Sequence, residues 1–459
     1  MWILSRRRAG VLLHPTALPG ENGPLGAAAR HFIDWLAAAG YSLWQVLPLG
    51  PVGESASPYW STSDHAFSPQ LIDHSEAQPP ESAPAAFAEF CARQSAWLED
   101  YALFTALSAE HRGAPWWQWP AALRERERGA LEAARARLGA AIRRLQIEQW
   151  QAATQWAALR QYAHARGVCI LGDLPIYVTP NSVAVWAERG QFLLKADGQP
   201  AMRAGVPPDY FAVDGQLWGN PLYDWPQAQR DGFAFWRARV GLQLQRFDWL
   251  RIDHFRGLES FWAVPESAPS ARSGQWLPAP GAELLLALRQ QHPQLPLVAE
   301  DLGVITAEVD ALRRRFGLPG MRVLQFGFDG NPDNRHLPQN FDPDSIAYTG
   351  THDNDTTLGW YRTLDATMRE RVDFMLRSDR VPMPEALLRA ALYSTAPVAI
   401  APLQDLVGCG SEGRFNTPGT ASGNWGWRMD AAALDERLTH WLRALNDSSG
   451  RTVQDTVNC

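Results

Sequence analysis

Three acidic segments of this 459-residue chain each follow an apolar run that is typical of a buried strand. They are Arg251–Gly257 with Asp253, Ala299–Gly303 with Glu300, and Gly350–Asp355 with Asp353. Because α/β barrels build their active sites at the carboxyl ends of parallel strands, we expect the three carboxylates to converge on one pocket. Two carboxyl groups that flank a glycosidic bond are enough to cleave it. The sequence therefore indicates carboxylate chemistry at one end of a parallel sheet.

The first segment places Arg251 two residues before Asp253. Side chains alternate along a strand, so these two lie on the same side of it. A guanidinium beside a carboxylate favours the ionised form of the acid, which a nucleophile needs. The alternative is a structural ion pair without a catalytic role.

The second segment ends in two adjacent acids, Glu300 and Asp301, whose side chains must point in different directions. If Glu300 faces the pocket, apolar surroundings will raise its pKa and allow it to act as a general acid. The alternative is a helix cap at the end of the strand, a role for which Asp301 is well suited.

The third segment places His352 and Asp353 on a turn. They can hydrogen-bond the neighbouring hydroxyls of a sugar, or they can form a satisfied turn network. Five consecutive turn residues cannot all face one metal ion, and no acidic loop with calcium spacing surrounds them. We therefore expect no metal ion and no cofactor.

Eight apolar runs, most of them rich in β-branched residues, recur at intervals that suit strands alternating with helices. Their hydrophobicity is mostly continuous, as in parallel strands that are covered on both faces. A helix is predicted over 27–39, with Phe32 and Leu36 on one face and Gly40 after its end. The pattern predicts a (β/α)8 barrel, and a doubly wound open sheet is the alternative. The runs are Gly10–Leu13, Leu43–Leu47, Val168–Leu174, Trp249–Asp253, Leu297–Glu300, Met321–Phe326, Ile346–Gly350 and Val398–Ile400.

The gap between the second and third runs is too long for one crossover helix. We predict a catalytic barrel over 1–430 that is interrupted by a mainly helical insertion over 75–165 and an aromatic loop insertion over 180–236. The Pro- and Ser-rich stretch over 265–280 is expected to be a further loop. A C-terminal helix and loose tail are predicted over 431–459, without a separate C-terminal β-sandwich.

The composition excludes several classes of partner. A net charge of -7 and a pI near 5.9 argue against nucleic acid or an anionic membrane, and no apolar run approaches membrane-spanning length. The four cysteines show no zinc spacing, so all are expected to be free thiols in a cytoplasmic protein. The 21 tryptophans are unusually many. Their flat rings suit the faces of sugars, although most are expected to be core residues.

Together with further motifs, the three segments resemble glycoside hydrolase family 77, the 4-α-glucanotransferases or amylomaltases. The similarity extends from about Gly10 to Trp427. The further motifs are Ser57–Tyr59, Gly172–Val178, Gly205–Phe211, Gly215–Pro221, Asn416–Thr420 and Gly423–Trp425.

The resemblance implies an enzyme that transfers α-1,4-glucan segments between malto-oligosaccharide or starch-like chains through a covalent glycosyl-enzyme intermediate. It implies that Asp253 is the nucleophile, Glu300 the general acid/base and Asp353 the stabiliser of the transition state. It also implies that the sugar-binding residues are Tyr59, Asp173, Trp218, Arg251, His352 and Asn424. A retaining site of this kind needs its two working carboxyls roughly 5 to 5.5 Å apart.

One departure from the family is the loop after Tyr59, where the usual Ser-Ala-Phe-Ala-Gly-Asn-Pro is replaced within residues 61–70. Others lie at Asn181, Ala184, Gly413 and Phe415. Hydrolysis of the α-amylase type is the alternative function, because both reactions share one intermediate. A non-catalytic glucan-binding protein is a second alternative, which predicts the loss of at least one of the three acids. The aromatic loop around Trp218 favours transfer, because a transferase must let a sugar compete with water.

Overall fold

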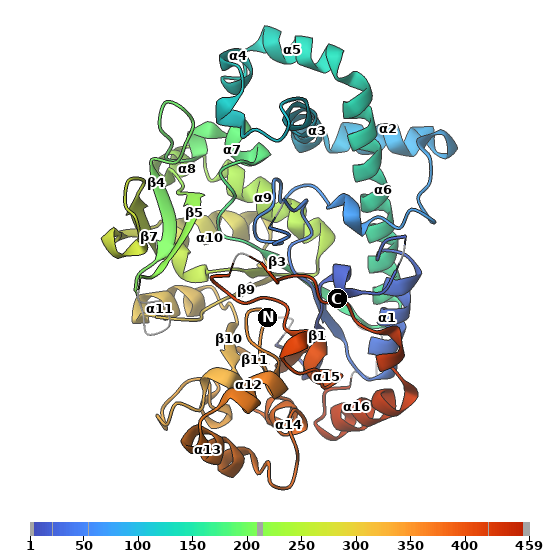
Figure 1. Ribbon diagram of the computed structural model, residues 1–459, viewed down its shortest axis with the longest axis vertical. Coiled ribbons are helices and arrows are strands. Elements are labelled where there is room, and N and C mark those ends of the chain that lie inside the picture. Colours follow the sequence, from blue (N-terminus) through green and yellow to red (C-terminus); the bar gives the residue numbers. More distant parts are fainter. Residues whose placement is uncertain (1–3, 21, 54, 209–213, 421, 453–459) are drawn as a thin grey trace.

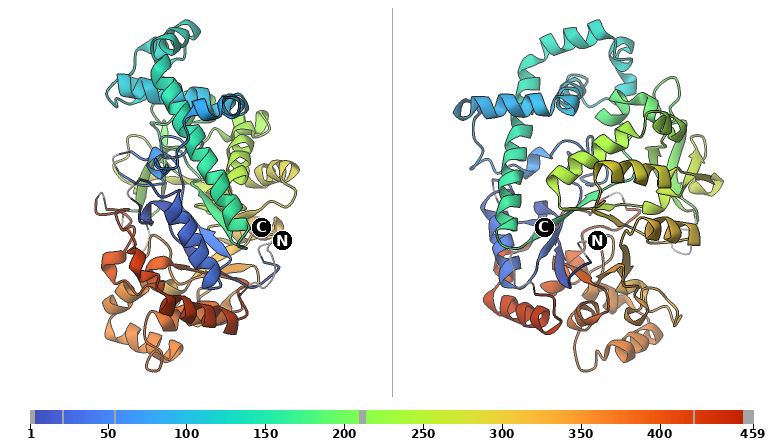
Figure 2. Two further views of the ribbon diagram at one scale, coloured as in Figure 1. Left: turned by 90° about the vertical axis from the view of Figure 1, so that its right-hand side faces the viewer. Right: turned by 180° about the vertical axis from the view of Figure 1, so that it is seen from behind.

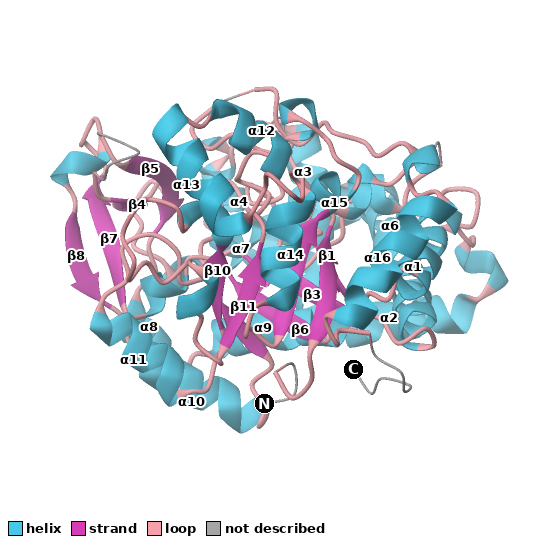
Figure 3. Ribbon diagram, turned by 90° about the horizontal axis from the view of Figure 1, so that it is seen from below, coloured by secondary structure: helices cyan, strands magenta, loops and turns pink. Residues whose placement is uncertain are grey.

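The computed structural model describes residues 4–452 except 21, 54, 209–213 and 421. Eight parallel strands form its central sheet (Figures 1 and 3), in the order β10-β11-β12-β1-β2-β3-β6-β9. All eight predicted strands are confirmed, with small shifts at their ends. They are β1 (Arg8–Leu12), β2 (Leu43–Gln45), β3 (Cys169–Leu174), β6 (Trp249–Ile252), β9 (Leu297–Ala299), β10 (Gly320–Val323), β11 (Ser345–Tyr348) and β12 (Val398–Pro402).

The sheet closes on itself between β9 and β10. No regular ladder joins these two strands in the sheet order, but the Ala299 N–H donates to the Pro319 carbonyl at 2.9 Å. We call this junction the seam. The predicted (β/α)8 barrel is confirmed, and the open doubly wound sheet is set aside.

Helices surround the barrel. The predicted first helix is α1 (Ala27–Ala38), which buries Phe32 and Leu36 and is followed by Gly40 at φ 83°. A left-handed residue at this position is tolerated best when it is glycine. The other helices that follow barrel strands are α9 (Ala234–Arg246), α10 (Gly281–Gln291), α11 (Ala307–Arg315), α12 (Thr357–Thr363), α13 (Ala366–Leu376), α14 (Glu385–Tyr393), α15 (Leu403–Leu406) and α16 (Glu436–Ser448).

A helical region extends beyond one side of the barrel (Figures 1 and 2). The long helix α6 connects it to the barrel, where α6 packs against α1 and β3. Its elements are α2 (Pro84–Arg93), α3 (Ser95–Glu110), α4 (Ala121–Arg124), α5 (Arg128–Arg137) and α6 (Gly139–His164). The division into a barrel and two insertions stays a prediction.

The aromatic stretch over 180–236 and the stretch over 265–280 are more regular than the sequence suggested. A four-stranded antiparallel sheet lies beside the barrel (Figure 3), in the order β5-β4-β7-β8. Cross-strand aromatic pairs such as Trp262 with Trp276, 5.2 Å between ring centroids, help to hold these short strands. The elements are α7 (Val183–Ala187), β4 (Met202–Val206), β5 (Gln216–Pro221), α8 (Trp225–Arg230), β7 (Ser260–Pro265) and β8 (Gln275–Pro278).

The prediction of free thiols is confirmed for Cys91 and Cys409. It is wrong for Cys169, which is disulfide-bonded, and Cys459 lies outside the described residues. Within the described part of the chain, no helix is long and apolar enough to cross a membrane.

Candidate active site

Arg251 is the centre of an ionic cluster at the ends of β3 and β6. Its guanidinium donates to Asp253 Oδ1 at 2.9 Å, to Asp173 Oδ2 at 3.0 Å and to the Tyr59 hydroxyl at 3.1 Å. Tyr59 donates in turn to Asp173 Oδ2 at 2.6 Å. The predicted contact between Arg251 and Asp253 is therefore present, and one guanidinium serves both acids.

Asp173 and Asp253 differ in exposure. The Asp173 side chain is fully buried, whereas that of Asp253 is 29% exposed. Burial raises the pKa of Asp173, and the charge of Arg251 opposes that shift. Burial also raises the pKa of the Tyr59 hydroxyl well above its ordinary value, so it remains a donor. Asp173 thus lies behind Tyr59 and Arg251 and positions both, while Asp253 faces the opening.

Glu300 is the inward member of the two adjacent acids. Its carboxyl accepts from two backbone N–H groups, those of His254 at 2.6 Å and Leu302 at 2.8 Å. Burial raises the pKa of Glu300 to about 8, and the charge of Asp253 adds to this effect. The expected general acid is therefore held in its protonated form near neutral pH. Because His254 directly follows Asp253, the same contact holds the chain segments that carry Asp253 and Glu300 side by side.

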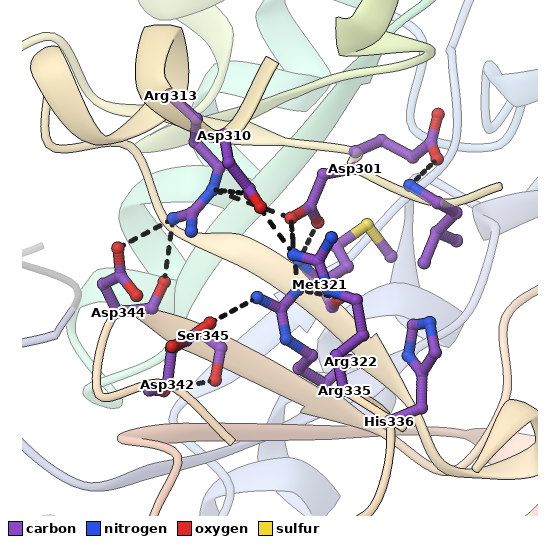
Figure 4. Close-up of polar contacts among 12 residues, drawn as sticks. Asp301, Asp310, Arg313, Met321, Arg322, Arg335, His336, Asp342, Asp344 and Ser345 are labelled. Carbon is purple, nitrogen blue, oxygen red and sulfur yellow. Dashed lines mark hydrogen bonds and ion pairs between the residues drawn. The ribbon is translucent and has the colours of Figure 1, made fainter. Parts of the chain in front are cut away.

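Asp301, the other acid, points away from the pocket into a buried cluster (Figure 4). Its Oδ1 accepts from the Met321 N–H at 2.6 Å. The suggested helix cap is wrong for Asp301, because the next helix begins at Ala307 and its N-cap residue is Thr306. Asp301 instead accepts a hydrogen bond from the backbone of the neighbouring strand β10.

His352 and Asp353 lie on the turn after β11, as predicted. The Asp353 side chain is 48% exposed, and its Oδ1 lies 3.4 Å from His352 Nε2. Asn416 donates its side-chain N–H to the same oxygen at 2.6 Å. The sequence motif included Asn416 but gave it no role, because 63 residues separate the two positions.

Aromatic rings line two sides of this site. Tyr59 stacks on His352, with 5.1 Å between centroids and 17° between planes. Trp218, on β5, meets the ring of His254 edge to face at 4.9 Å. Since the backbone N–H of His254 also donates to Glu300, Trp218 lies on the Glu300 side of the site. Tyr210 and Phe211, at the end of the Gly205–Phe211 motif, lie outside the described residues.

Among the described residues, the side chain of Asn424 forms hydrogen bonds within its own loop and none with the three acids. Its side-chain oxygen accepts from the Thr417 N–H at 2.9 Å, and its N–H group donates to Thr420. These contacts hold the loop that also carries Asn416. A direct contact between Asn424 and a sugar stays a prediction.

The divergent loop 61–70 is fixed by a buried ion pair. Asp64 Oδ2 accepts from Arg239 Nε, and the Arg239 side chain is fully buried on α9. The same guanidinium donates to the carbonyls of Pro175 at 2.5 Å and Ile176 at 3.0 Å, just after β3. This loop therefore joins the segment that carries Tyr59 to the strand end that carries Asp173.

Comparisons with known proteins agree with this arrangement. A family model described as 4-alpha-glucanotransferase, glycoside hydrolase family 77, matches residues 13–83 and 74–433. The 4-alpha-glucanotransferase of Thermus thermophilus is 44% identical and covers 97% of this chain and 99% of its own length. That of Synechocystis is 42% identical, with 99% and 100% covered. The solved amylomaltase of Streptococcus agalactiae in complex with acarbose superposes with a TM-score of 0.93 at 32% identity, with 98% of this chain and 100% of that chain covered.

Proposed function

The chain belongs to the 4-α-glucanotransferases of glycoside hydrolase family 77, and we propose that Asp253, Glu300 and Asp353 carry out its reaction. It is an enzyme that transfers α-1,4-glucan segments between malto-oligosaccharide or longer glucan chains, with retention at the anomeric carbon. The α-amylase type of hydrolysis is set aside on the same family evidence. The roles below follow from the contacts of each side chain.

Asp253 is the nucleophile. Its carboxylate accepts a charge-assisted hydrogen bond from Arg251, and its partial exposure gives a sugar access to it. Attack of a carboxylate oxygen on the anomeric carbon breaks the glycosidic bond and forms a glycosyl ester.

Glu300 is the general acid in this first step. The observation that carries the proposal is its buried carboxyl, whose pKa is raised to about 8 while the neighbouring Asp253 stays paired with Arg251. Two carboxyls with opposite protonation states are the requirement of a retaining glycosidase site. Glu300 gives its proton to the departing sugar oxygen. As a carboxylate it then accepts the proton of the incoming hydroxyl, which displaces Asp253.

Asp353 binds the sugar whose bond is cleaved. Its Oδ1 lies beside the His352 ring, which stacks on Tyr59, and together these groups can hold the ring hydroxyls and the positive charge that develops in the transition state. Asn416 fixes the Asp353 carboxylate in this orientation. Tyr59 and Arg251 complete this sugar site, with Asp173 behind them.

Trp218 binds the acceptor. Its ring is partly exposed next to His254, on the side of Glu300 from which the leaving sugar departs and the acceptor enters. An indole ring offers a sugar an apolar face that water cannot use, so it favours transfer over hydrolysis.

Incubation with pure maltotriose followed by product sizing tests this function. We expect glucose together with chains longer than maltotriose. Glucose and maltose without longer chains would refute the transferase assignment. The cytoplasmic location expected from the sequence remains a prediction that cell fractionation can test.

A further inference from the structure

At the seam, backbone N–H groups of β10 donate to side chains instead of to a neighbouring strand. Successive backbone N–H groups of a strand point to opposite edges, and on β10 the N–H group of Gly320 points to β11. The N–H groups of Met321 and Val323 therefore point to the seam. Met321 donates to Asp301 Oδ1 at 2.6 Å, and Val323 donates to His336 Nδ1 at 3.0 Å. Next to Glu300, the Met321 N–H therefore donates to the Asp301 carboxylate instead of to a backbone carbonyl of β9.

Asp301 is surrounded by arginines in the interior (Figure 4). Its Oδ2 lies 2.8 Å from Arg335 Nη2, 3.1 Å from Arg322 Nη1 and 3.6 Å from Arg313 Nε. The side chains of Asp301, Arg313 and Arg322 are all fully buried. Three further acids, each about one-third exposed, balance the arginines: Asp310, Asp342 and Asp344.

Gly320 shows how closely the backbone fits this carboxylate. A Cβ atom at this position would lie 2.4 Å from Asp301 Oδ2, so a side chain would displace the acid. The strand β10 thus approaches Asp301 along its bare backbone.

Such a cluster adds little to the stability of the fold, because the desolvation of buried charges cancels most of their attraction. It is a strong constraint on geometry, since several charged hydrogen bonds fix one carboxylate. Asp301 is covalently next to Glu300, so whatever fixes Asp301 also fixes the main chain that carries the acid.

We propose that Asp301 is a positioning residue that closes the barrel seam and thereby holds Glu300 where it can protonate the leaving oxygen. Asp301 does not touch the reacting atoms, so it acts through Glu300. This inference depends on the proposed role of Glu300 as the acid.

The test uses two donors that differ in their need for an acid. Maltotriose needs a proton on its leaving oxygen, whereas α-maltosyl fluoride releases fluoride without one. For Asp301→Asn in the full-length protein, we expect kcat/KM on maltotriose to fall about 10- to 100-fold, as for a misplaced catalytic group. On α-maltosyl fluoride we expect kcat/KM to fall by less than about threefold, because fluoride leaves without a proton from the acid. An equal fall on both donors, or no fall on maltotriose, overturns the proposal.

Asp310→Asn is the matched control. Asp310 contacts Arg313 and Arg335 at 3.7 and 3.4 Å but not Met321, so the same charge is lost while the seam contact stays. Near-normal rates on both donors are expected, and a split between donors like that of Asp301→Asn contradicts the seam argument. If Asp301→Asn does not fold, Arg335→Met decides, because its side chain is 29% exposed and touches Asp301. A smaller split supports the proposal, and wild-type rates on both donors overturn it.

Glu300→Gln separates this inference from the proposed function. It should lower kcat/KM on maltotriose far more than kcat/KM on α-maltosyl fluoride. An equal loss on both donors would refute the role of Glu300 itself, whatever Asp301→Asn does.

Discussion

The raised pKa of Glu300 predicts how the stability of the protein depends on pH. The folded value is about 8 against an ordinary value of 4.5, because the carboxyl is buried and close to Asp253. Between these two pH values the folded state keeps a proton that the unfolded state has lost. The stability that this proton provides is complete below pH 4.5 and is lost as the pH rises through 8.

The size of the effect follows from the shift. About 1.4 kcal/mol for each pKa unit gives about 5 kcal/mol over the whole range. Glu300→Gln has no proton to lose. Its free energy of unfolding, relative to that of the wild type, should therefore rise by about 4 kcal/mol between pH 5 and pH 9.

Equilibrium urea denaturation, followed by tryptophan fluorescence at pH 5, 7 and 9, measures this difference. Glu283→Gln, which removes an exposed carboxylate on α10, is the control and should follow the wild type. The same pKa should appear as a fall of kcat/KM on maltotriose above about pH 8, since the acid must be protonated. A wild type and Glu300→Gln whose stabilities change in parallel with pH would refute the reasoning, and so would a fall in kcat/KM that begins below pH 6.

Three further predictions concern other side chains. Asp253→Asn should fold and lose at least about 10⁴-fold in kcat, as expected for a covalent nucleophile, and near-wild-type turnover would disprove that role. Trp218→Ala should weaken the acceptor contact by about 1 kcal/mol, so that product sizing shows more glucose released to water per transfer, and an unchanged ratio would contradict its acceptor role. Asp64→Ala should destabilise the protein by about 3 kcal/mol in urea denaturation, because it leaves Arg239 buried without its carboxylate. The exposed pair of Glu125 and Arg189 is the matched control, and Glu125→Ala should cost less than about 1 kcal/mol.

The sequence was sufficient to predict the barrel and the position of its acids. Apolar runs marked all eight strands, and the polar residues after three of them lie at one end of the barrel, as parallel strands require. Alternation along β6 correctly placed Arg251 beside Asp253. These are local properties, so they can be read from a few consecutive residues.

Contacts between distant segments could not be predicted in this way. Asn416 reaches Asp353 from another loop, and Asp301 reaches Met321 and Arg335 across the seam. The antiparallel sheet was missed because its strands are short, contain prolines and glycines, and are completed by partners up to about 60 residues away in the chain. No periodicity in one segment reveals a partner in another.

The different surroundings of the Asp253 and Glu300 carboxyls can be traced to one position on each of two paired strands. Arg251 lies two residues before Asp253, and Val298 lies two residues before Glu300. These two residues are direct partners in the β6–β9 ladder, so both side chains point into the barrel. The acid after β6 therefore has a guanidinium at 2.9 Å, while the acid after β9 follows a buried isopropyl group and accepts from the neutral N–H groups of His254 and Leu302. Strand alternation thus places a cation before one carboxyl and an apolar side chain before the other, which fits the proposed division of two similar side chains into a nucleophile and a general acid.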